Sequence, residues 1–239
     1  MIEVQGLTKR YGKKKNTFIA LDNVSFSIES GSSVAIIGKS GSGKSTLMHC
    51  MSGLDRPTLG EVKVDGESIG GMKQKTLDNF RSKKIGFIFQ AFFVQANETC
   101  VQNVGLPLEI SKTKYATRKR LILSALKTVG LEDKANQKAK NLSGGQKQRL
   151  AIARALVGKP SILFADEPTG NLDSQTGDQI EKLLFALNKK VGMTLIIVTH
   201  DSDLAARCDR QITLKDGKVI SDTLKSTAKV QPSKVKVAS

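Results

Sequence analysis

Short apolar runs separated by polar turns predict a chain that alternates strands with helices. Residues 24–28 alternate apolar and polar positions with a period of two, as a half-buried antiparallel strand does, and residues 2–4 and 18–21 are shorter apolar runs of the same region. Residues 60–66 predict a strand closed by an Asp-Gly turn. Unbroken apolar runs predict buried strands at 34–37, 85–89, 161–165 and 194–199. The run at 161–165 suits the central strand of a parallel sheet, which is buried on both faces.

Apolar positions that recur every three or four residues predict helices at 118–129, 147–157 and 176–190, and an earlier helix beginning at Thr46. Residues 91–141 have a helical pattern and no further strand signal, so they predict a separate helical lobe. Residues 211–224 predict a closing hairpin. The basic, proline-containing tail from Lys225 onward predicts loose or weakly helical chain.

The composition permits one sizeable α/β core with a smaller attached lobe, since the chain has 239 residues with ordinary apolar content. No run reaches the roughly 18 apolar residues that span a bilayer, and the N-terminus lacks the basic-then-apolar pattern of a secretory signal. Cys50, Cys100 and Cys208 are scattered without metal-type or C-x-x-C spacing. We therefore expect reduced, buried thiols in a cytosolic protein.

The net charge of +16 raises the question of an anionic partner. Basic residues cluster at 9–15, at 118–120 and in the tail from 225, but they are not interleaved with stacking aromatic residues or set in a nucleic-acid motif. We expect no nucleic acid as a partner. Most of the charge is expected on solvated faces, and attraction to the headgroups of an anionic membrane leaflet is the alternative.

A glycine-rich stretch carries the strongest chemical signal. Residues 38–45 fit the phosphate-binding pattern G-x-x-x-x-G-K-[ST], between an expected strand and an expected helix. Glycines allow the tight turn, backbone N–H groups point at phosphate oxygens, and the helix N-terminus adds partial positive charge. Lys44 is expected to reach the outer phosphates, and the Ser45 hydroxyl to bind Mg²⁺.

Ser143, Gly144 and Gly145 precede the helix expected at 147–157, and they could form a second anion site by the same backbone logic. The alternative is an ordinary N-cap with a flexible entry. Tyr11, in a basic loop with a glycine, could stack on a purine ring or could serve ordinary packing.

Polar residues follow two of the expected strands directly. Asp166 and Glu167 follow the run at 161–165, and His200 follows the run at 194–199. Ligands bind at the carboxyl ends of parallel strands. Asp166 is therefore expected to hold Mg²⁺ through water, Glu167 to orient or deprotonate an attacking water, and His200 to contact a γ-phosphate oxygen. The competing interpretation of the two carboxylates is a cap for the turn at 168–170.

Together these residues resemble the nucleotide-binding subunit of an ABC transporter. Residues 142–146, Leu-Ser-Gly-Gly-Gln, match the signature sequence of that family, which is far more specific than the phosphate-binding loop. The order of the motifs agrees over residues 1–224: the phosphate-binding loop, Gln90, the signature, Asp166-Glu167, residues 171–173 and His200.

The resemblance implies the α/β ABC ATPase fold: a P-loop NTPase core with a mostly parallel sheet, an N-terminal antiparallel β subdomain and an inserted helical subdomain at about 91–157. It places the ATP-binding domain at 1–224 and leaves a basic tail at 225–239. It implies hydrolysis of ATP with Mg²⁺, coupled to transmembrane transport. The catalytic residues are then Lys44, Glu167 and His200, and the metal is held by Ser45, Gln90 and Asp166. The nucleotide-binding residues are Tyr11, Gly38, Lys39, Ser40, Gly41, Ser42, Gly43, Lys44, Ser45, Thr46, Gln90, Ser143, Gly144, Gly145, Gln146 and Asp173.

The resemblance also implies partners. In a head-to-tail dimer with a second copy, Ser143 and Gly145 would touch the γ-phosphate bound by the opposite chain, and Asp173 would lie at the dimer seam. The helical lobe would receive a separate transmembrane permease subunit at the cytoplasmic face of the membrane. Residues 166–173 look most like the subgroup that serves lipoprotein release, macrolide efflux and antimicrobial-peptide resistance, which favours export or peptide resistance.

Two other function classes remain as alternatives. A non-transport ABC ATPase could act on ribosomes or DNA, but translation-type members carry two cassettes on one chain, and repair types insert long coiled coils that are absent from this sequence. A P-loop kinase or GTPase would leave residues 143–145 unexplained. The segment 91–104 departs from the subgroup, because the usual proline is missing and Gln102 replaces an acid. This departure puts the fit to the membrane partner in question.

Overall fold

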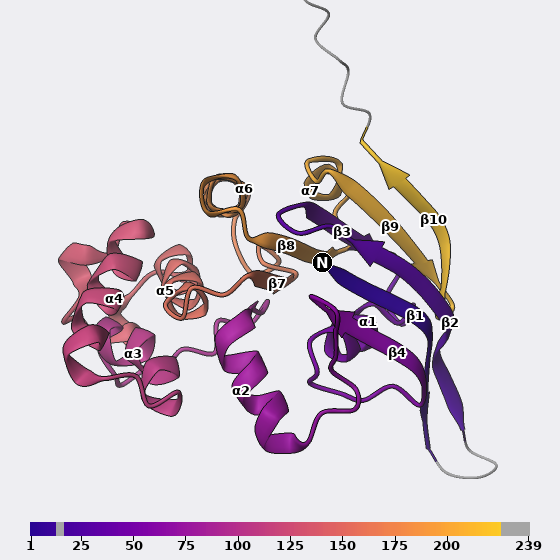
Figure 1. Cartoon of the computed structure of the whole chain (residues 1–239). Helices are drawn as coiled ribbons and strands as arrows, with labels where there is room; N and C mark the ends of the chain where they lie inside the picture. Colours follow the sequence, from indigo (N-terminus) through magenta and orange to yellow (C-terminus); the bar gives the residue numbers. More distant parts are fainter. Residues whose placement is uncertain (13–16, 226–239) are drawn as a thin grey trace, which may run out of the picture.

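The computed structural model describes residues 1–12 and 17–225. One of its two sheets is antiparallel and contains β1 (Ile2–Tyr11), β2 (Phe18–Ile28), β4 (Leu59–Val64) and β5 (Glu67–Ser68) in the order β2-β1-β4-β5. This is the N-terminal antiparallel unit that the resemblance implies (Figure 1).

The second sheet has the order β10-β9-β3-β8-β7-β6, and its five strands from β9 to β6 are parallel to one another. β10 closes this sheet as an antiparallel hairpin with β9, as predicted for residues 211–224. The strand bounds are β3 (Ser33–Ile37), β6 (Ile85–Ile88), β7 (Ile162–Asp166), β8 (Thr194–Thr199), β9 (Arg210–Lys215) and β10 (Lys218–Leu224).

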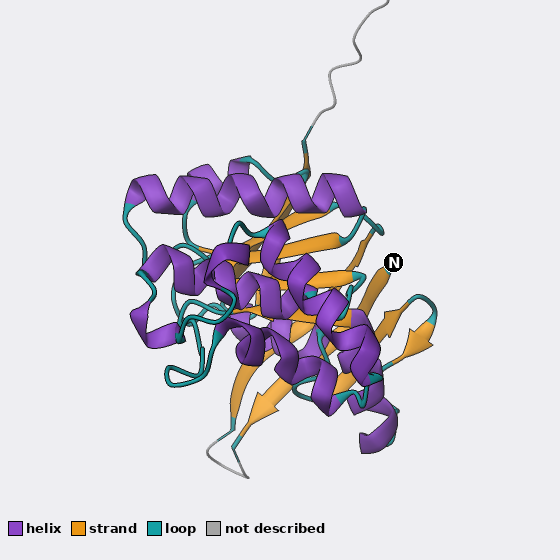
Figure 2. Cartoon of the chain, turned by 90° about the vertical axis from the view of Figure 1, so that its left-hand side faces the viewer, coloured by secondary structure: helices purple, strands orange, loops and turns teal. Residues whose placement is uncertain are grey.

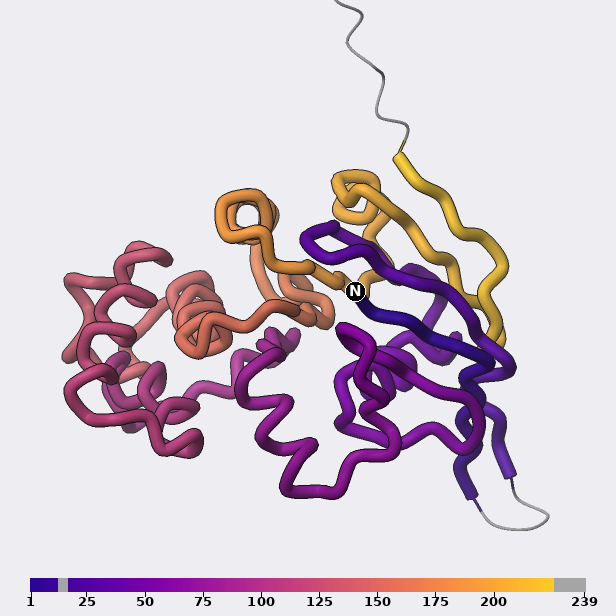
Figure 3. Tube along the Cα trace, viewed as in Figure 1, coloured from indigo at the N-terminus to yellow at the C-terminus, as the bar shows by residue number. Residues whose placement is uncertain are grey.

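Helices α3 to α7 contribute to the hydrophobic cluster on one face of the parallel sheet, and α1 and α2 contribute to the cluster on the other face. Figure 2 looks onto the strands past helices that lie in front of them, and α3, α4 and α5 lie together beside the core in Figures 1 and 3. The bounds are α1 (Lys44–Met51), α2 (Gln74–Lys84), α3 (Cys100–Ile110), α4 (Tyr115–Thr128), α5 (Gly144–Leu156), α6 (Ser174–Val191) and α7 (Ser202–Ala206), with short 3-10 turns at Glu132–Lys134 and Ala139–Asn141. Within residues 1–12 and 17–225, none of the helices has both the length and the apolar character needed to cross a bilayer.

The parallel sheet is buried on both faces, as its apolar runs predict. Alternate residues of β7 enter two different hydrophobic clusters: Leu163 and Ala165 pack in one, and Ile162 and Phe164 in the other. Period-two alternation in a strand sends neighbouring side chains to opposite faces. The α/β fold with a mostly parallel sheet is therefore confirmed. The three cysteines are free and buried, also as expected.

The N-terminal strands differ from their prediction. Residues 18–21 and 24–28 belong to one strand, β2, and Tyr11 is the last residue of β1 rather than part of a loop. The polar pair Asp22-Asn23 interrupts the apolar pattern at an irregularity in the pairing of β1 with β2. Asn23 takes the left-handed conformation (φ 52°), which asparagine tolerates better than most residues. A break in alternation thus marks a bulge here and not a turn.

Three helical details were also missed. α5 begins at Gly144, three residues before the expected start, because Ser143 caps it. α2 buries only Leu77 and Phe80, which is too few apolar positions to create a helical period. α7 is five residues long. The tail expected to be loose or weakly helical lies, beyond Lys225, outside the described residues.

Candidate active site

A cleft of about 750 Å³ opens at the carboxyl ends of the parallel strands. It is bounded by the phosphate-binding loop after β3, by two carboxylates after β7 and by a histidine after β8. The residues that line it are Phe18, Ala20, Lys39, Ser40, Gly41, Gly43, Lys44, Ser45, Thr46, Gln90, Asp166, Glu167 and His200. Most of the predicted site residues therefore meet in one place, where ligands bind in parallel α/β sheets.

The phosphate-binding loop needs glycine at two crowded positions. A Cβ on Gly38 would lie 2.3 Å from the Leu214 carbonyl oxygen, and a Cβ on Gly43 would lie 2.5 Å from that of Ala20. Both glycines have φ values in the left-handed region, 155° and 99°, which residues with a Cβ adopt at a cost. The tight turn thus depends on the glycines that the motif specifies.

The start of α1 leaves its backbone donors available. Its N-cap is Gly43, which offers no side-chain cap, so the first N–H groups of the helix point toward the cleft with the positive end of the helix dipole. The Lys44 ammonium donates to the carbonyl oxygens of Gly38 (2.7 Å) and Lys39 (3.0 Å). Ser42 is different: its side chain is buried, its Oγ has no hydrogen-bond partner among the described residues, and it does not line the cleft.

Glu167 is held firmly at the cleft. Its backbone has a left-handed φ of 44°, and its N–H donates to the Val198 carbonyl of β8 (2.8 Å). One carboxylate oxygen accepts from the His200 backbone N–H (3.0 Å) and lies 2.7 Å from His200 Nδ1, while the other accepts from the Thr199 hydroxyl (3.0 Å). A carboxylate fixed in this way is suited to orienting and deprotonating a water.

Asp166 lines the same cleft. Burial, followed by the neighbouring Glu167 charge, raises the pKa of its carboxyl, so a cation beside it would relieve an unfavourable charge. The oxygens of Ser45, Gln90 and Asp166 are the hard donors that Mg²⁺ prefers. Among the described residues no cluster of three or more His, Cys, Asp or Glu side chains could hold a metal by itself. This donor set fits an Mg²⁺ that is also bound by nucleotide phosphates.

Gln90 reaches the cleft from the end of β6 and is tied to the segment after Glu167. Its side-chain amide lies 3.4 Å from Asn171 Oδ1, and Asn171 Nδ2 donates to its backbone oxygen (2.9 Å). The cleft and the residues that follow the two carboxylates are therefore physically connected.

The signature residues lie outside the cleft. Ser143 caps α5 by accepting from the Gln146 N–H (3.3 Å), and Gln146 Oε1 accepts from the Ser143 N–H (3.0 Å), which completes a capping box. The interpretation of Ser143 as an ordinary N-cap is therefore confirmed, and the same capping box also uses the Gln146 side chain. A Cβ on Gly145 would lie 2.4 Å from Thr176 Cγ2, so that glycine is also needed where α5 meets α6. Gly144 stays exposed.

Asp173 and Tyr11 likewise lie away from the cleft lining. Asp173 caps α6, its carboxylate accepting from the Thr176 N–H (2.9 Å). Tyr11 donates its hydroxyl proton to Asp55 (2.7 Å) and pairs across the strands with Phe18, whose exposed ring does line the cleft. Phe18 was missed from the sequence, and its position opposite Tyr11 is the signal that could have found it.

The atypical segment after Gln90 is well fixed. Gln102, in place of the expected acid, still closes a capping box on α3: its Oε1 accepts from the Thr99 N–H (2.8 Å). Arg154 of α5 donates to the carbonyl oxygens of Phe93 (2.6 Å) and Phe92 (3.1 Å). The missing proline and the missing acid therefore leave a structured connection.

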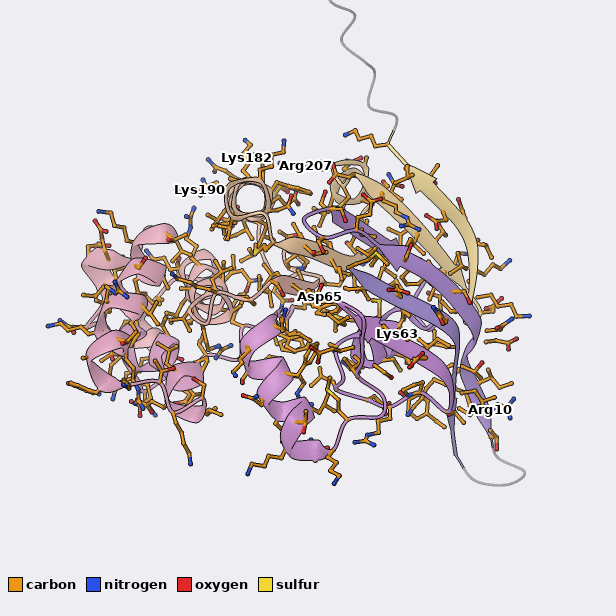
Figure 4. All side chains as sticks on the ribbon, in the orientation of Figure 1. Arg10, Lys63, Asp65, Lys182, Lys190 and Arg207 are labelled. Carbon is orange, nitrogen blue, oxygen red and sulfur yellow. The ribbon has the colours of Figure 1, made fainter. Side chains whose placement is uncertain are left out.

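Basic side chains outside the cleft are distributed over several elements. Figure 4 shows Lys182 and Lys190 pointing outward from α6 and Arg10 from the far end of the antiparallel sheet. Arg207 is paired with Asp178 (3.3 Å) and Glu181 (2.7 Å).

Comparison with known proteins identifies the family of the chain. The family model described as "ABC transporter" matches residues 21–170. The lipoprotein-releasing system ATP-binding protein LolD of Syntrophotalea carbinolica is 46% identical, over 92% of this chain and 96% of the relative. An uncharacterized ABC transporter ATP-binding protein, YbbA of Escherichia coli K12, is 42% identical over 92% and 96%.

Solved structures give the same result. The dimeric ATP-binding cassette MJ0796, in a post-hydrolysis state bound to ADP and Pi, superposes with a TM-score of 0.85 at 42% identity, over 94% of this chain and 98% of that one. The phosphate-binding loop, the signature and the paired carboxylates thus occur in a fold that this family shares. The chain belongs to the ABC transporter family, as one of its ATP-binding, ATP-hydrolysing subunits.

Proposed function

We propose that two copies associate head to tail, so that the cleft of one chain closes against Ser143 and Gly145 of the other, with ATP between them. The observation that carries this proposal is the separation of the two phosphate-binding elements. The cleft is lined by Lys44, Asp166, Glu167 and His200, and the last two are bound to each other. The start of α5 lies outside the cleft. Dimerisation would supply the missing wall, and the dimeric cassette MJ0796 supports the arrangement.

In this proposal each site residue has one task. The N–H groups of residues 39–46 bind phosphate oxygens, and Lys44 neutralises the outer phosphates. Glu167 accepts a proton from the attacking water, while His200 orients that water and the γ-phosphate. Ser45, Gln90 and Asp166 would hold Mg²⁺, which when bound neutralises charge on the phosphates. Tyr11 or the neighbouring Phe18 stacks on adenine.

The proposed partner is a transmembrane permease that docks on the helical lobe at about 91–157, within an ATPase domain spanning 1–224. The subunit would then work at the cytoplasmic face of the membrane, where the basic surface could contact anionic headgroups. The similarity to LolD, the ATP-binding protein of a lipoprotein-releasing system, supports export as the direction of transport.

A mixing experiment tests the head-to-tail geometry. Lys44→Ala removes one chain's phosphate contact, and Ser143→Asp keeps the helix cap but adds a negative charge where phosphate is expected. Each variant alone should be inactive. A one-to-one mixture should recover about a quarter of wild-type ATPase activity, because about half of the dimers are mixed and each mixed dimer has one intact site.

The control is Ser124→Asp, the same change at an exposed position of α4, which should remain active. If Ser143→Asp alone is fully active, or if mixing with Lys44→Ala recovers nothing, the shared site is wrong.

A second experiment tests Glu167. Glu167→Gln should bind ATP, stop hydrolysis and accumulate as a dimer in size-exclusion chromatography with light scattering. Glu132→Gln, an equal change at an exposed position on the 3-10 turn, should hydrolyse ATP normally and show no ATP-stable dimer. Full turnover by Glu167→Gln would remove Glu167 from its assigned role.

A further inference from the structure

Thr199 is the last residue of β8 and is buried, with 1% of its surface exposed. Its hydroxyl oxygen accepts from the Asp201 N–H (3.0 Å). A backbone N–H can only donate, so this bond leaves the single hydroxyl proton of Thr199 free to donate elsewhere. It is directed to Glu167 Oε2 at 3.0 Å. The direction of the bond is therefore set by chemistry, with Glu167 as the acceptor.

The two oxygens of Glu167 are held by different groups. Oε1 is held by the backbone N–H and the ring of His200, and Oε2 is held by Thr199 alone among the contacts of the described residues. Held at Oε1 alone, the carboxylate could pivot about that oxygen through the torsions of its own side chain, whereas a second held oxygen fixes the orientation of its plane. His200 is mostly exposed, with 74% of its side chain accessible, so the buried Thr199 is the more rigid of the two supports.

β8 gives Thr199 a rigid base. The strand lies between β3 and β7 and is buried along its whole length, and Thr199 pairs with Ile37, directly before the phosphate-binding loop. A β-branched side chain in a strand has few rotamers. One buried hydroxyl thus links the carboxylate to the strand framework that also carries the loop.

We infer that Thr199 is a positioning residue that sets the carboxylate plane of Glu167 for its reaction with water. This inference rests on the role proposed above for Glu167. Hydrogen bonds to charged groups are among the strong ones. Thr199 does not line the cleft itself, and its side chain meets the cleft through the bond to Glu167. It should therefore affect the chemical step and leave ATP binding intact.

The test compares Thr199→Val, which keeps the shape and removes the hydroxyl, with Thr199→Ser, which keeps the hydroxyl. We expect Thr199→Val to lower kcat for ATP hydrolysis about 10- to 100-fold, with KM for ATP within about twofold of wild type. Thr199→Ser should restore kcat to within about threefold of wild type. A crystal structure of Thr199→Val should show the Glu167 carboxylate rotated or in two conformers.

The matched control is Thr194→Val at the other end of β8. Thr194 is also buried, and its hydroxyl accepts from the Gly31 N–H (3.0 Å), far from the cleft. This variant should lose thermal stability and keep kcat. In the Glu167→Gln background, adding Thr199→Val should leave ATP-dependent dimerisation unchanged and produce no further loss of single-turnover rate.

Each outcome has a clear consequence. A wild-type kcat for Thr199→Val, a loss in Thr199→Ser equal to that in Thr199→Val, or a raised KM with unchanged kcat would overturn the inference. If Thr199→Val does not fold, Thr199→Ala takes its place, with the same comparison to Thr199→Ser. Full turnover by Glu167→Gln would instead overturn the role proposed for Glu167, on which the inference rests.

Discussion

Arg154 offers a quantitative test of how the segment after Gln90 is held. The Arg154→Met variant keeps the aliphatic stem and removes both hydrogen bonds, to the carbonyl oxygens of Phe92 and Phe93. Burial lowers the pKa of the Arg154 guanidinium, which shows that holding the charge there has a desolvation cost that the two bonds must offset.

The expected loss follows from these opposing effects. Hydrogen bonds with a charged donor are worth about 1.5–3 kcal/mol each. Phe93 is exposed and Phe92 is half-buried, so water replaces part of what their carbonyls lose, and removing the charge returns its desolvation cost. We expect a net loss of about 2 kcal/mol, which lowers Tm by about 4–8 °C in a chain of this size.

Calorimetry measures the change in Tm, and hydrogen exchange measures the opening of residues 91–99. Protection should fall in that segment and stay unchanged in β7 and β8. The control is Lys147→Met on the same helix, a half-buried position that should shift Tm by less than about 2 °C. If Arg154→Met matches this control in both Tm and exchange, the two hydrogen bonds do not stabilise the segment.

Three further predictions concern groups outside the cleft. Burial, and then the bond to Asp55, raises the pKa of Tyr11 to about 12. The stability that this bond provides is therefore complete below pH ~10 and is lost as pH rises through about 12. In a pH titration followed by absorbance, Tyr11→Phe should abolish the late tyrosinate step. Gly145→Ala forces a Cβ to within 2.4 Å of Thr176 Cγ2 and should destabilise the α5–α6 contact by about 1–3 kcal/mol in denaturant unfolding, whereas a neutral result would show that Thr176 moves freely. Burial, and then the neighbouring Asp209 charge, raises the pKa of Cys208 to about 12, so a thiol reagent at pH ~8 should modify Cys208 only after unfolding, and rapid labelling of the native protein would contradict its burial.

The buried strands could be predicted because each face of the parallel sheet is covered. Residues 194–199 are all buried, and such a strand appears in the sequence as a continuous apolar run. The helix α2 could not be predicted, because its two buried residues are too few to create a helical repeat of apolar positions. The strand β2 was divided in two because the sequence pattern does not distinguish a bulge from a turn.

The cleft residues at the ends of these buried strands could be predicted as well. Asp166, Glu167 and His200 directly follow apolar runs, so their meeting follows from the parallel order of β7 and β8. Thr199 and Arg154 were missed because their partners lie 32 and 61–62 residues away. No local spacing marks such contacts, since only the folded chain brings the two ends together.

The ammonium of Lys44 is held by two carbonyl oxygens of its own loop, so the backbone of the loop fixes where this positive charge lies. In the proposed site, phosphate binding would exchange the acceptors around a cation that is already placed, and the turn would not have to fold first. Little binding free energy is spent on ordering, and the bound and free loops should be nearly superimposable. In the proposed head-to-tail dimer, recognition of the triphosphate by this loop would therefore be closer to lock-and-key, and the larger motion would be the approach of the second copy.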